Sequence, residues 1–157
     1  MVELNCPTRL SAIKTQIVLT QTDTTVGFSS QNETRLKEIK SRQDTKPFIK
    51  LFRDFALLQK SAIRIPNTQK SRVRRSKKTT FIVKGSSFRV AQTQLESAVL
   101  RELPWCYSTS ANEAGKGFER EFCQTHAQII IEDAKGLFEG KASTLYKINA
   151  TKIKRLR

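Results

Sequence analysis

Several residue types on which protein chemistry often depends are scarce in this chain of 157 residues, which has one histidine, one tryptophan and three cysteines. The cysteines at 6, 106 and 123 are odd in number and far apart, and no C-x-x-C pair occurs. We therefore expect neither a disulfide framework nor a zinc site, and we expect reduced thiols in a cytoplasmic protein. A serine–histidine nucleophile system would have to use His126, which has no metal-ligand cluster around it, so we expect no such system.

Long apolar runs and glycine-rich nucleotide motifs are absent as well. No run approaches the roughly 20 residues that cross a bilayer, so we expect no membrane partner. Residues 136–142 contain glycine and lysine at the wrong spacing for a P-loop, and Ala142 stands where serine or threonine is required. An enzyme of this composition would position reactants and neutralise charge, without an obvious acid–base residue.

Acidic residues are few compared with basic ones. The chain has 29 Lys and Arg against 14 Asp and Glu, a formal net charge of +15. A field of this sign attracts the phosphates of nucleotides, nucleic acids or acidic lipids. In the densest run, residues 70–78, six of nine residues are basic. That run is typical of a solvated connector or of a patch facing RNA or phosphate, and both interpretations stay open.

Apolar, β-branched segments alternate with amphipathic ones along the chain. We predict strands at residues 17–19, 48–52, 79–83, 88–91, 105–107, 128–131 and 143–148. We predict helices that start near 30–33, 54, 95 and 118, and a basic tail at 150–157. The pattern is typical of a single α/β domain over residues 1–157, with an antiparallel hairpin at 79–91.

Two polar segments follow predicted strands: residues 21–25 (QTDTT) and 108–112 (STSAN). In open α/β sheets, ligands bind outside the carboxyl ends of strands. Unpaired hydroxyl and amide groups cannot fill a core, so both segments are candidates for holding one polar ligand. The alternatives are a turn that caps itself through Asp23 and a solvated loop with an asparagine cap.

Taken in order, these segments resemble the YrdC family of threonylcarbamoyl-adenylate synthases. Residues 108–112 are similar to the family's S-x-S-A-N loop, and residues 21–24 to its P-T-[DE]-T loop, with Gln21 in place of proline. Residues 40–42 resemble the K-x-R motif and residues 46–48 the K-P-[LF] that follows. The family's strand after G-P-x-T is similar to residues 80–82, and its A-V-R segment is similar to residues 88–90. Its P-S-T-I-V strand resembles residues 142–146.

The resemblance implies a YrdC-like twisted open mixed sheet with flanking helices and a basic concave face. It implies a nucleotidyltransferase, L-threonylcarbamoyladenylate synthase, which joins L-threonine, bicarbonate and ATP with Mg²⁺ and releases pyrophosphate. Its product would serve N6-threonylcarbamoyladenosine modification of tRNA position 37 through downstream threonylcarbamoyl-transfer proteins. Transfer RNA or double-stranded RNA is a further candidate partner.

The resemblance also supplies candidate site residues, because phosphates and carboxylates are held best by lysine and arginine. For the nucleotide they are Lys40, Arg42, Ser110 and Asn112; for threonine and its carbamate they are Thr22, Thr24, Lys46, Arg89, Ser108 and Ser143. No metal ligand is assigned, since phosphates and water can hold Mg²⁺. The charged candidates could instead be ordinary solvated residues. A non-catalytic protein that binds RNA or nucleotide with the same basic face is the alternative function.

Overall fold

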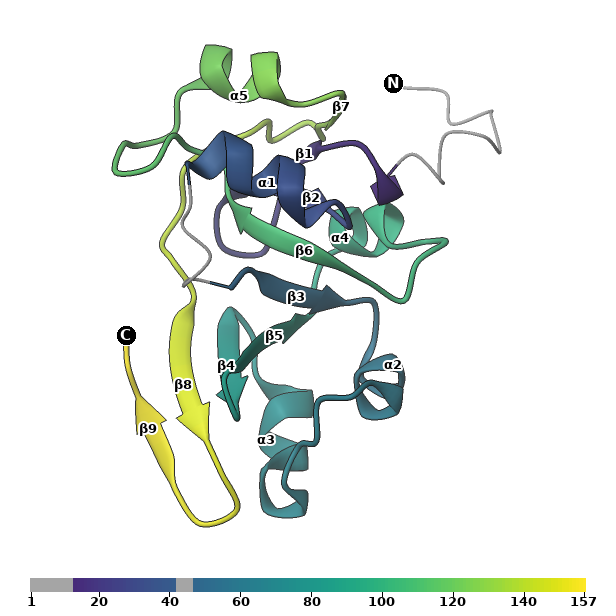
Figure 1. Ribbon diagram of the computed structural model, residues 1–157, viewed down its shortest axis with the longest axis vertical. Helices are drawn as coiled ribbons and strands as arrows, with labels where there is room; N and C mark the ends of the chain where they lie inside the picture. The colour runs from purple at the N-terminus through teal and green to yellow at the C-terminus, as the bar shows by residue number, and fades with distance from the viewer. Residues whose placement is uncertain (1–12, 42–46) are drawn as a thin grey trace.

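The computed structural model describes residues 13–41 and 47–157, so the candidates Arg42 and Lys46 lie outside the described residues (Figure 1). One nine-stranded mixed sheet has the order β7-β1-β2-β6-β3-β5-β4-β8-β9. The strands are β1 (Val18–Gln21), β2 (Val26–Ser30), β3 (Ile49–Phe52), β4 (Thr79–Val83), β5 (Ser86–Val90), β6 (Trp105–Ser110), β7 (Ile129–Ile131), β8 (Thr144–Ile148) and β9 (Ile153–Arg155). A mixed α/β fold is therefore confirmed.

Short helices connect the strands, and side-chain caps begin several of them. They are α1 (Glu33–Lys40), α2 (Phe55–Lys60), the 3₁₀ turn η2 (Asn67–Gln69), α3 (Lys70–Arg75), α4 (Gln94–Val99) and α5 (Arg120–His126). Asn32 accepts from the Arg35 amide at the start of α1, and Ser41, with φ of 44°, ends that helix. No helix in the described part of the chain is long and apolar enough to span a membrane.

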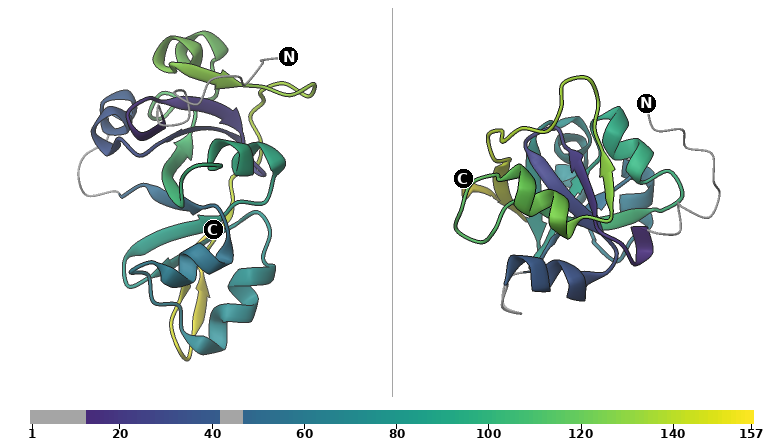
Figure 2. Two further views of the ribbon diagram at one scale, coloured as in Figure 1. Left: turned by 90° about the vertical axis from the view of Figure 1, so that its right-hand side faces the viewer. Right: turned by 90° about the horizontal axis from the view of Figure 1, so that it is seen from above.

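The helices cover the two faces of the sheet unequally. The front face, which carries Phe28, Phe52 and Phe88, packs against α1 and α5 in one core cluster and against α2 and α3 in another. The rear face, which carries Leu51 and Cys106, packs against α4. Seen from above in Figure 2, α1 and α4 lie on opposite sides of β1 and β2. Of the helices in the described part of the chain, the rear-face core cluster includes a residue of α4 and none of α1, α2, α3 or α5.

Four segments differ from the sequence-based expectations. Residues 26–28, expected to close a loop, belong to β2, and β6 continues through Ser110, so three of the five STSAN residues are strand. The surface excursion expected at 65–78 instead contributes Ile65 and Val73 to the core. The basic tail supplies β9, which pairs with β8 at the sheet edge. β2 and β6 pair with each other from distant parts of the chain, whereas β9 follows β8 after a short turn and its basic residues do not give an apolar strand pattern.

Candidate functional site

Strand pairing gathers several candidate hydroxyls on the rear face. Directly paired residues project from the same face of a sheet, and that face changes at every residue along a strand. Ser108 pairs with Ser29 on β2 and with Ile49 on β3, whereas Leu51, two residues further along β3, pairs with Arg89 on β5. Ser108 and Arg89 therefore lie on the same, rear face.

The rear face continues across β4 to β8 as a polar surface. One step along the β4–β5 ladder from the pair Phe81–Phe88, Thr80 stands opposite Arg89. The Thr80 hydroxyl lies 2.8 Å from the Ser143 hydroxyl in a buried contact. Arg157 donates from Nε to the Ser143 carbonyl oxygen over 3.0 Å, which adds a second guanidinium beside this serine.

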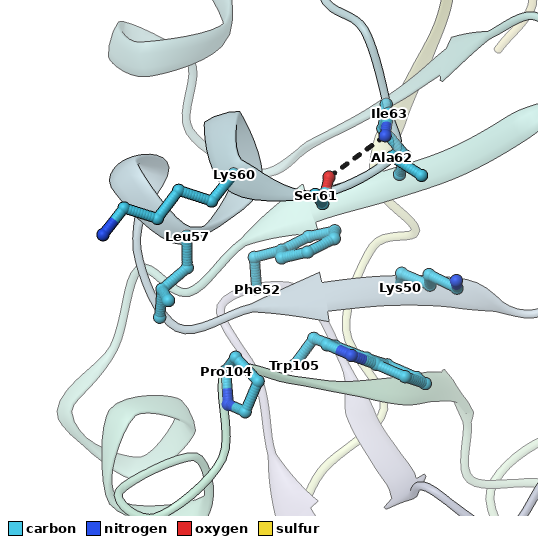
Figure 3. Close-up of a pocket in the computed structure, with 9 residues that line it drawn as sticks. All are labelled: Lys50, Phe52, Leu57, Lys60, Ser61, Ala62, Ile63, Pro104 and Trp105. Atoms are coloured by element: carbon cyan, nitrogen blue, oxygen red, sulfur yellow. Dashed lines mark hydrogen bonds between the residues drawn. The ribbon is translucent and has the colours of Figure 1, made fainter.

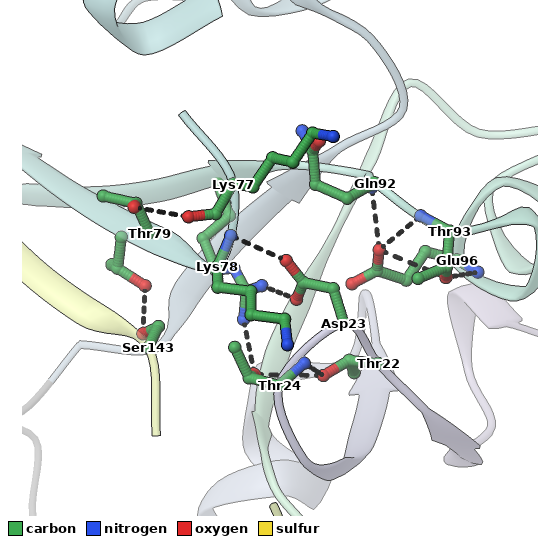
Figure 4. A network of polar contacts seen from close by, with 12 residues as sticks. Thr22, Asp23, Thr24, Lys77, Lys78, Thr79, Gln92, Thr93, Glu96 and Ser143 are labelled. Atoms are coloured by element: carbon green, nitrogen blue, oxygen red, sulfur yellow. Dashed lines mark hydrogen bonds and ion pairs between the residues drawn. The ribbon is translucent and has the colours of Figure 1, made fainter. Parts of the chain in front are cut away.

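The turn between β1 and β2, whose residues Thr22, Asp23 and Thr24 are labelled in Figure 4, holds Arg89. Its Nη2 forms an ion pair with Asp23, and its Nη1 donates to Thr24 Oγ1 over 3.1 Å. Asp23 also accepts from the Lys78 amide over 3.1 Å, so one carboxylate ties the turn to β4 and to β5. This buried, charge-assisted network fixes the guanidinium in one orientation.

One donor of the Arg89 side chain, Nε, is not used in this network. Arg89 is 8 % exposed, and its buried Nε has no hydrogen-bond partner among the described residues. Burial lowers the pKa of Arg89, and the nearby carboxylate of Glu96 opposes that shift. Because a guanidinium keeps its proton at any physiological pH, Arg89 is a cation that is paired with Asp23 and has one buried donor unpaired among the described residues.

The threonine residues of the turn cap the turn itself. Thr22 Oγ1 accepts from the amides of Thr24 and Thr25 over 3.2 Å each, and it donates to the Thr25 carbonyl oxygen over 2.7 Å. The Thr22 hydroxyl therefore caps the turn, and the Asp23 carboxylate binds Arg89 instead. A Cβ placed on Gly27 would lie 3.2 Å from Thr22 Cγ2 and 3.9 Å from Ser108 Oγ, so this glycine sits between the two candidate side chains.

Lys40 anchors the loop that follows β6. Its ammonium donates to the carbonyl oxygens of Ser110 and Asn112 over 3.0 and 2.7 Å, and to Asn112 Oδ1 over 2.8 Å. The Ser110 hydroxyl lies 2.6 Å from the same Oδ1. The three nucleotide candidates within the described residues thus form one cluster, in which Lys40 is buried at the end of α1.

We expect Lys40→Met to destabilise the protein by about 2 kcal/mol, because three oxygen atoms lose a charged donor. Residues 111–117 should also exchange amide hydrogens faster, since the loop loses its anchor. Urea unfolding and hydrogen exchange would measure both effects. The matched control is Lys37→Met in the same helix, which removes an i,i+4 pair with Glu33 at 3.2 Å and should cost under about 0.5 kcal/mol. Equal effects of the two variants would contradict the anchoring role.

The site has little acid–base or metal-binding capacity. Among the described residues, no group of three His, Cys, Asp or Glu side chains could hold a metal ion. His126 lies in α5, where its Nδ1 donates to the Phe122 carbonyl oxygen over 2.8 Å. Burial raises the pKa of the Cys106 thiol to about 12, so it is no nucleophile at neutral pH. The arrangement can position and neutralise anions.

Sequence reasoning missed three residues that shape this site: Asp23, Thr80 and Glu96. The sequence pattern marks Asp23 as a turn cap and as part of the P-T-[DE]-T resemblance, and its place between two threonines of a polar loop is a usable signal for a site residue. Glu96 is 1 % exposed and completes a capping box with Thr93 at the start of α4. Its second oxygen, like the Thr20 hydroxyl, is buried with no partner in the part of the chain that the structure describes.

The chain matches no known family profile and no curated protein sequence, whereas its structure resembles several solved ones. Sua5 from P. abyssi superposes with a TM-score of 0.79 and 19 % identity over 94 % of this chain and 53 % of Sua5. YciO from E. coli superposes with a TM-score of 0.73 and 18 % identity over 94 % of this chain and 87 % of YciO. HypF, in a phosphate- and nucleotide-bound form, superposes with a TM-score of 0.74 and 16 % identity over 94 % of this chain and 28 % of HypF.

The likeness extends to Sua5 complexed with L-threonine, with a TM-score of 0.72 and 18 % identity over 90 % of this chain and 50 % of Sua5. The present chain thus spans about half the length of Sua5. At these identities the comparison establishes the fold, and the chemistry has to be argued from the residues.

Proposed function

We propose that this chain, which has the YrdC-like fold of Sua5 and YciO, is an L-threonylcarbamoyladenylate synthase. It would form threonylcarbamoyl-AMP and pyrophosphate from L-threonine, bicarbonate and ATP, for N6-threonylcarbamoyladenosine modification of tRNA. The observation that carries the proposal is Arg89, a buried cation with one donor unpaired, on the same sheet face as Ser108 and the Thr80–Ser143 pair.

The solved relatives support the two ligand classes that this reaction needs. Sua5 has been solved with L-threonine, and HypF with phosphate and nucleotide. In the present chain the Arg89 cluster offers a cation and hydroxyls, which suit an amino-acid carboxylate and hydroxyl. The Lys40 cluster offers a cation near the neutral side chains of Ser110 and Asn112, which suits phosphate and ribose.

In the proposed reaction the carbamate of threonine attacks the α-phosphorus of ATP, and pyrophosphate leaves. Both reactants are anions, so the protein has to bring them together and offset their repulsion. Arg89 would hold the threonine moiety, with Thr22, Thr24, Ser108 and Ser143 orienting it. Lys40, together with Arg42 and Lys46, would balance the charge of the phosphates and carbamate. Mg²⁺ would arrive bound to the ATP phosphates, since the described residues offer it no carboxylate cluster.

Pyrophosphate release from ATP by the purified protein tests the proposal. We expect release that requires both L-threonine and bicarbonate, and none when D-threonine replaces the L-enantiomer. The reason is that an amino acid contacted at several points, by Arg89 and by hydroxyls of the β1–β2 turn and of Ser108, is bound with stereochemical discrimination. Circular dichroism would establish that the sample is folded. A folded protein without release, at any threonine concentration, would reject the synthase.

One observation favours the second candidate, a binding protein without catalysis. The ammonium of Lys40 already contacts three internal oxygens, and Arg89 is already paired with Asp23. Internal pairing of both cations suits a structural scaffold whose surface binds RNA or nucleotide. That protein would release no pyrophosphate, and its RNA affinity would fall steeply with salt and be unaffected by ATP or threonine.

A further inference from the structure

The front face of the sheet carries two neighbouring aromatic rings that the proposed reaction does not use. Trp105 and Tyr107 project from the same side of β6, with ring centroids 5.0 Å apart in an edge-on arrangement. Lys50 on β3 pairs directly with Tyr107 on β6. Its ammonium lies 4.7 Å from the centroid of the Trp105 ring and 5.8 Å from that of the Tyr107 ring. Figure 1 shows this part of β6 and β3 between α1 and α2.

A cavity of about 320 Å³ opens beside Trp105 (Figure 3). Phe52 and Ile63 are among its apolar lining residues, Ser61 adds a hydroxyl, and Lys50 and Lys60 add two ammonium groups. A cavity of this size can admit one planar ring system. Its lining combines apolar surface, an aromatic ring and positive charge.

The two lysines are not engaged in ion pairs within the described part of the chain. Over residues 13–41 and 47–157, no ion pair joins Lys50 or Lys60 to a carboxylate. Lys60 is exposed, and Trp105 and Lys50 are half-buried. A ligand that fits has a flat π-system for Trp105 and negative charge for the lysines, and a nucleobase with its flanking phosphates has both.

We propose that this aromatic–lysine strip, composed of Lys50, Lys60, Trp105 and Tyr107, binds single-stranded RNA. One base stacks on Trp105, and the adjacent phosphates contact Lys50 and Lys60. Charge complementarity favours this ligand, because the chain carries a net charge of +15 and neither lysine forms an ion pair with a described carboxylate. A duplex hides its base faces, so it does not fit this strip.

The strip is separate from the proposed synthase site. Trp105 and Tyr107 alternate along β6 with Cys106 and Ser108, and therefore project from the opposite face of the sheet. RNA bound to the strip lies on the other side of the sheet from Arg89 and the rear-face hydroxyls. Loss of RNA binding and loss of pyrophosphate release can consequently be observed independently of each other.

The chain contains a single tryptophan, Trp105, so tryptophan fluorescence reports on the strip. We expect an oligouridylate of about 12 nucleotides to quench this fluorescence as it binds, because a base stacks on the indole. A duplex of the same length should leave it unchanged. By fluorescence anisotropy of a labelled oligonucleotide, Trp105→Leu should weaken binding about tenfold and Trp105→Phe much less, since phenylalanine still stacks.

Lys50→Gln should lower the slope of log affinity against log salt by about one, as expected for one lost phosphate contact. The matched control is Lys147→Gln, an exposed lysine of β8 on the rear face, which should leave quenching unchanged. Each variant should keep the wild-type circular dichroism spectrum and the wild-type rate of pyrophosphate release, whatever that rate is.

Three results would overturn the proposal. One is the absence of quenching by the single strand. Another is equal affinity of Trp105→Leu and wild type in folded samples. The third is equal quenching by polyglutamate, which would assign the strip to an acidic protein partner.

Discussion

Arg89→Gln is expected to lower the rate of pyrophosphate release at least about a hundredfold, because the cation that would hold the threonine moiety is removed. The same change should lower the free energy of unfolding by about 3 kcal/mol. Asp23 and Arg89 have side chains only 6 % and 9 % exposed, so the variant leaves a buried carboxylate without its partner. Steady-state kinetics and urea unfolding of the same preparation would measure the two effects.

The double variant Asp23→Asn/Arg89→Gln separates these roles. With both charges removed, much of the stability should return, because the buried pair is then replaced by two neutral amides. Activity should stay low, because the binding cation is still missing. Full turnover by a folded Arg89→Gln protein would contradict the assignment of this residue. A double variant as unstable as the single one would show that the lost stability has another source.

Gly140→Ala is the second change for which we expect a large effect. A Cβ at this position would stand 1.8 Å from the Thr24 carbonyl oxygen and 3.0 Å from its carbonyl carbon. Both are backbone atoms of the turn that holds Arg89, so relief requires the turn to move. We expect a loss of about 3 kcal/mol in unfolding free energy and a higher KM for L-threonine.

The matched control is Gly117→Ala, where the nearest atom to a new Cβ is Glu139 Oε2 at 3.2 Å. That oxygen ends a flexible side chain and can shift, so stability should change by less than about 1 kcal/mol. The segment after α5 reaches the turn through two further bonds: the Val26 amide donates to the Phe138 carbonyl oxygen over 3.1 Å, and the Gly140 amide donates to Thr25 Oγ1 over 3.0 Å. Equal stability of the two variants would show that Gly140 does not support the turn.

Elements with strong local signals were predictable from the sequence. The hairpin of β4 and β5 follows from β-branched and aromatic residues around Gly85, which has φ of 83° as its turn requires. Helix α1 follows from its Asn32 cap and from Leu36 on its buried side. In both cases a few neighbouring residues determine the conformation.

Elements stabilised by distant partners were not predictable. The sequence of β2 ends in two serines, yet every residue of that strand is buried, because β1 and β6 flank it and α1 packs nearby. At the candidate site, sequence order placed Arg89 and the QTDTT turn in separate motifs. Their ion pair joins residues 66 positions apart, and only the folded sheet brings them into contact.

The position of β6 has a consequence for how the molecule acquires its structure. β6 is the sole link in sheet order between β7-β1-β2 and β3-β5-β4-β8-β9, although the chain makes β2 and β3 long before it. During synthesis these early strands must wait for residues 105–110 before they share a sheet, and pairing over such separations is slow to nucleate. The early chain therefore exposes unpaired strand edges until β6 has been made.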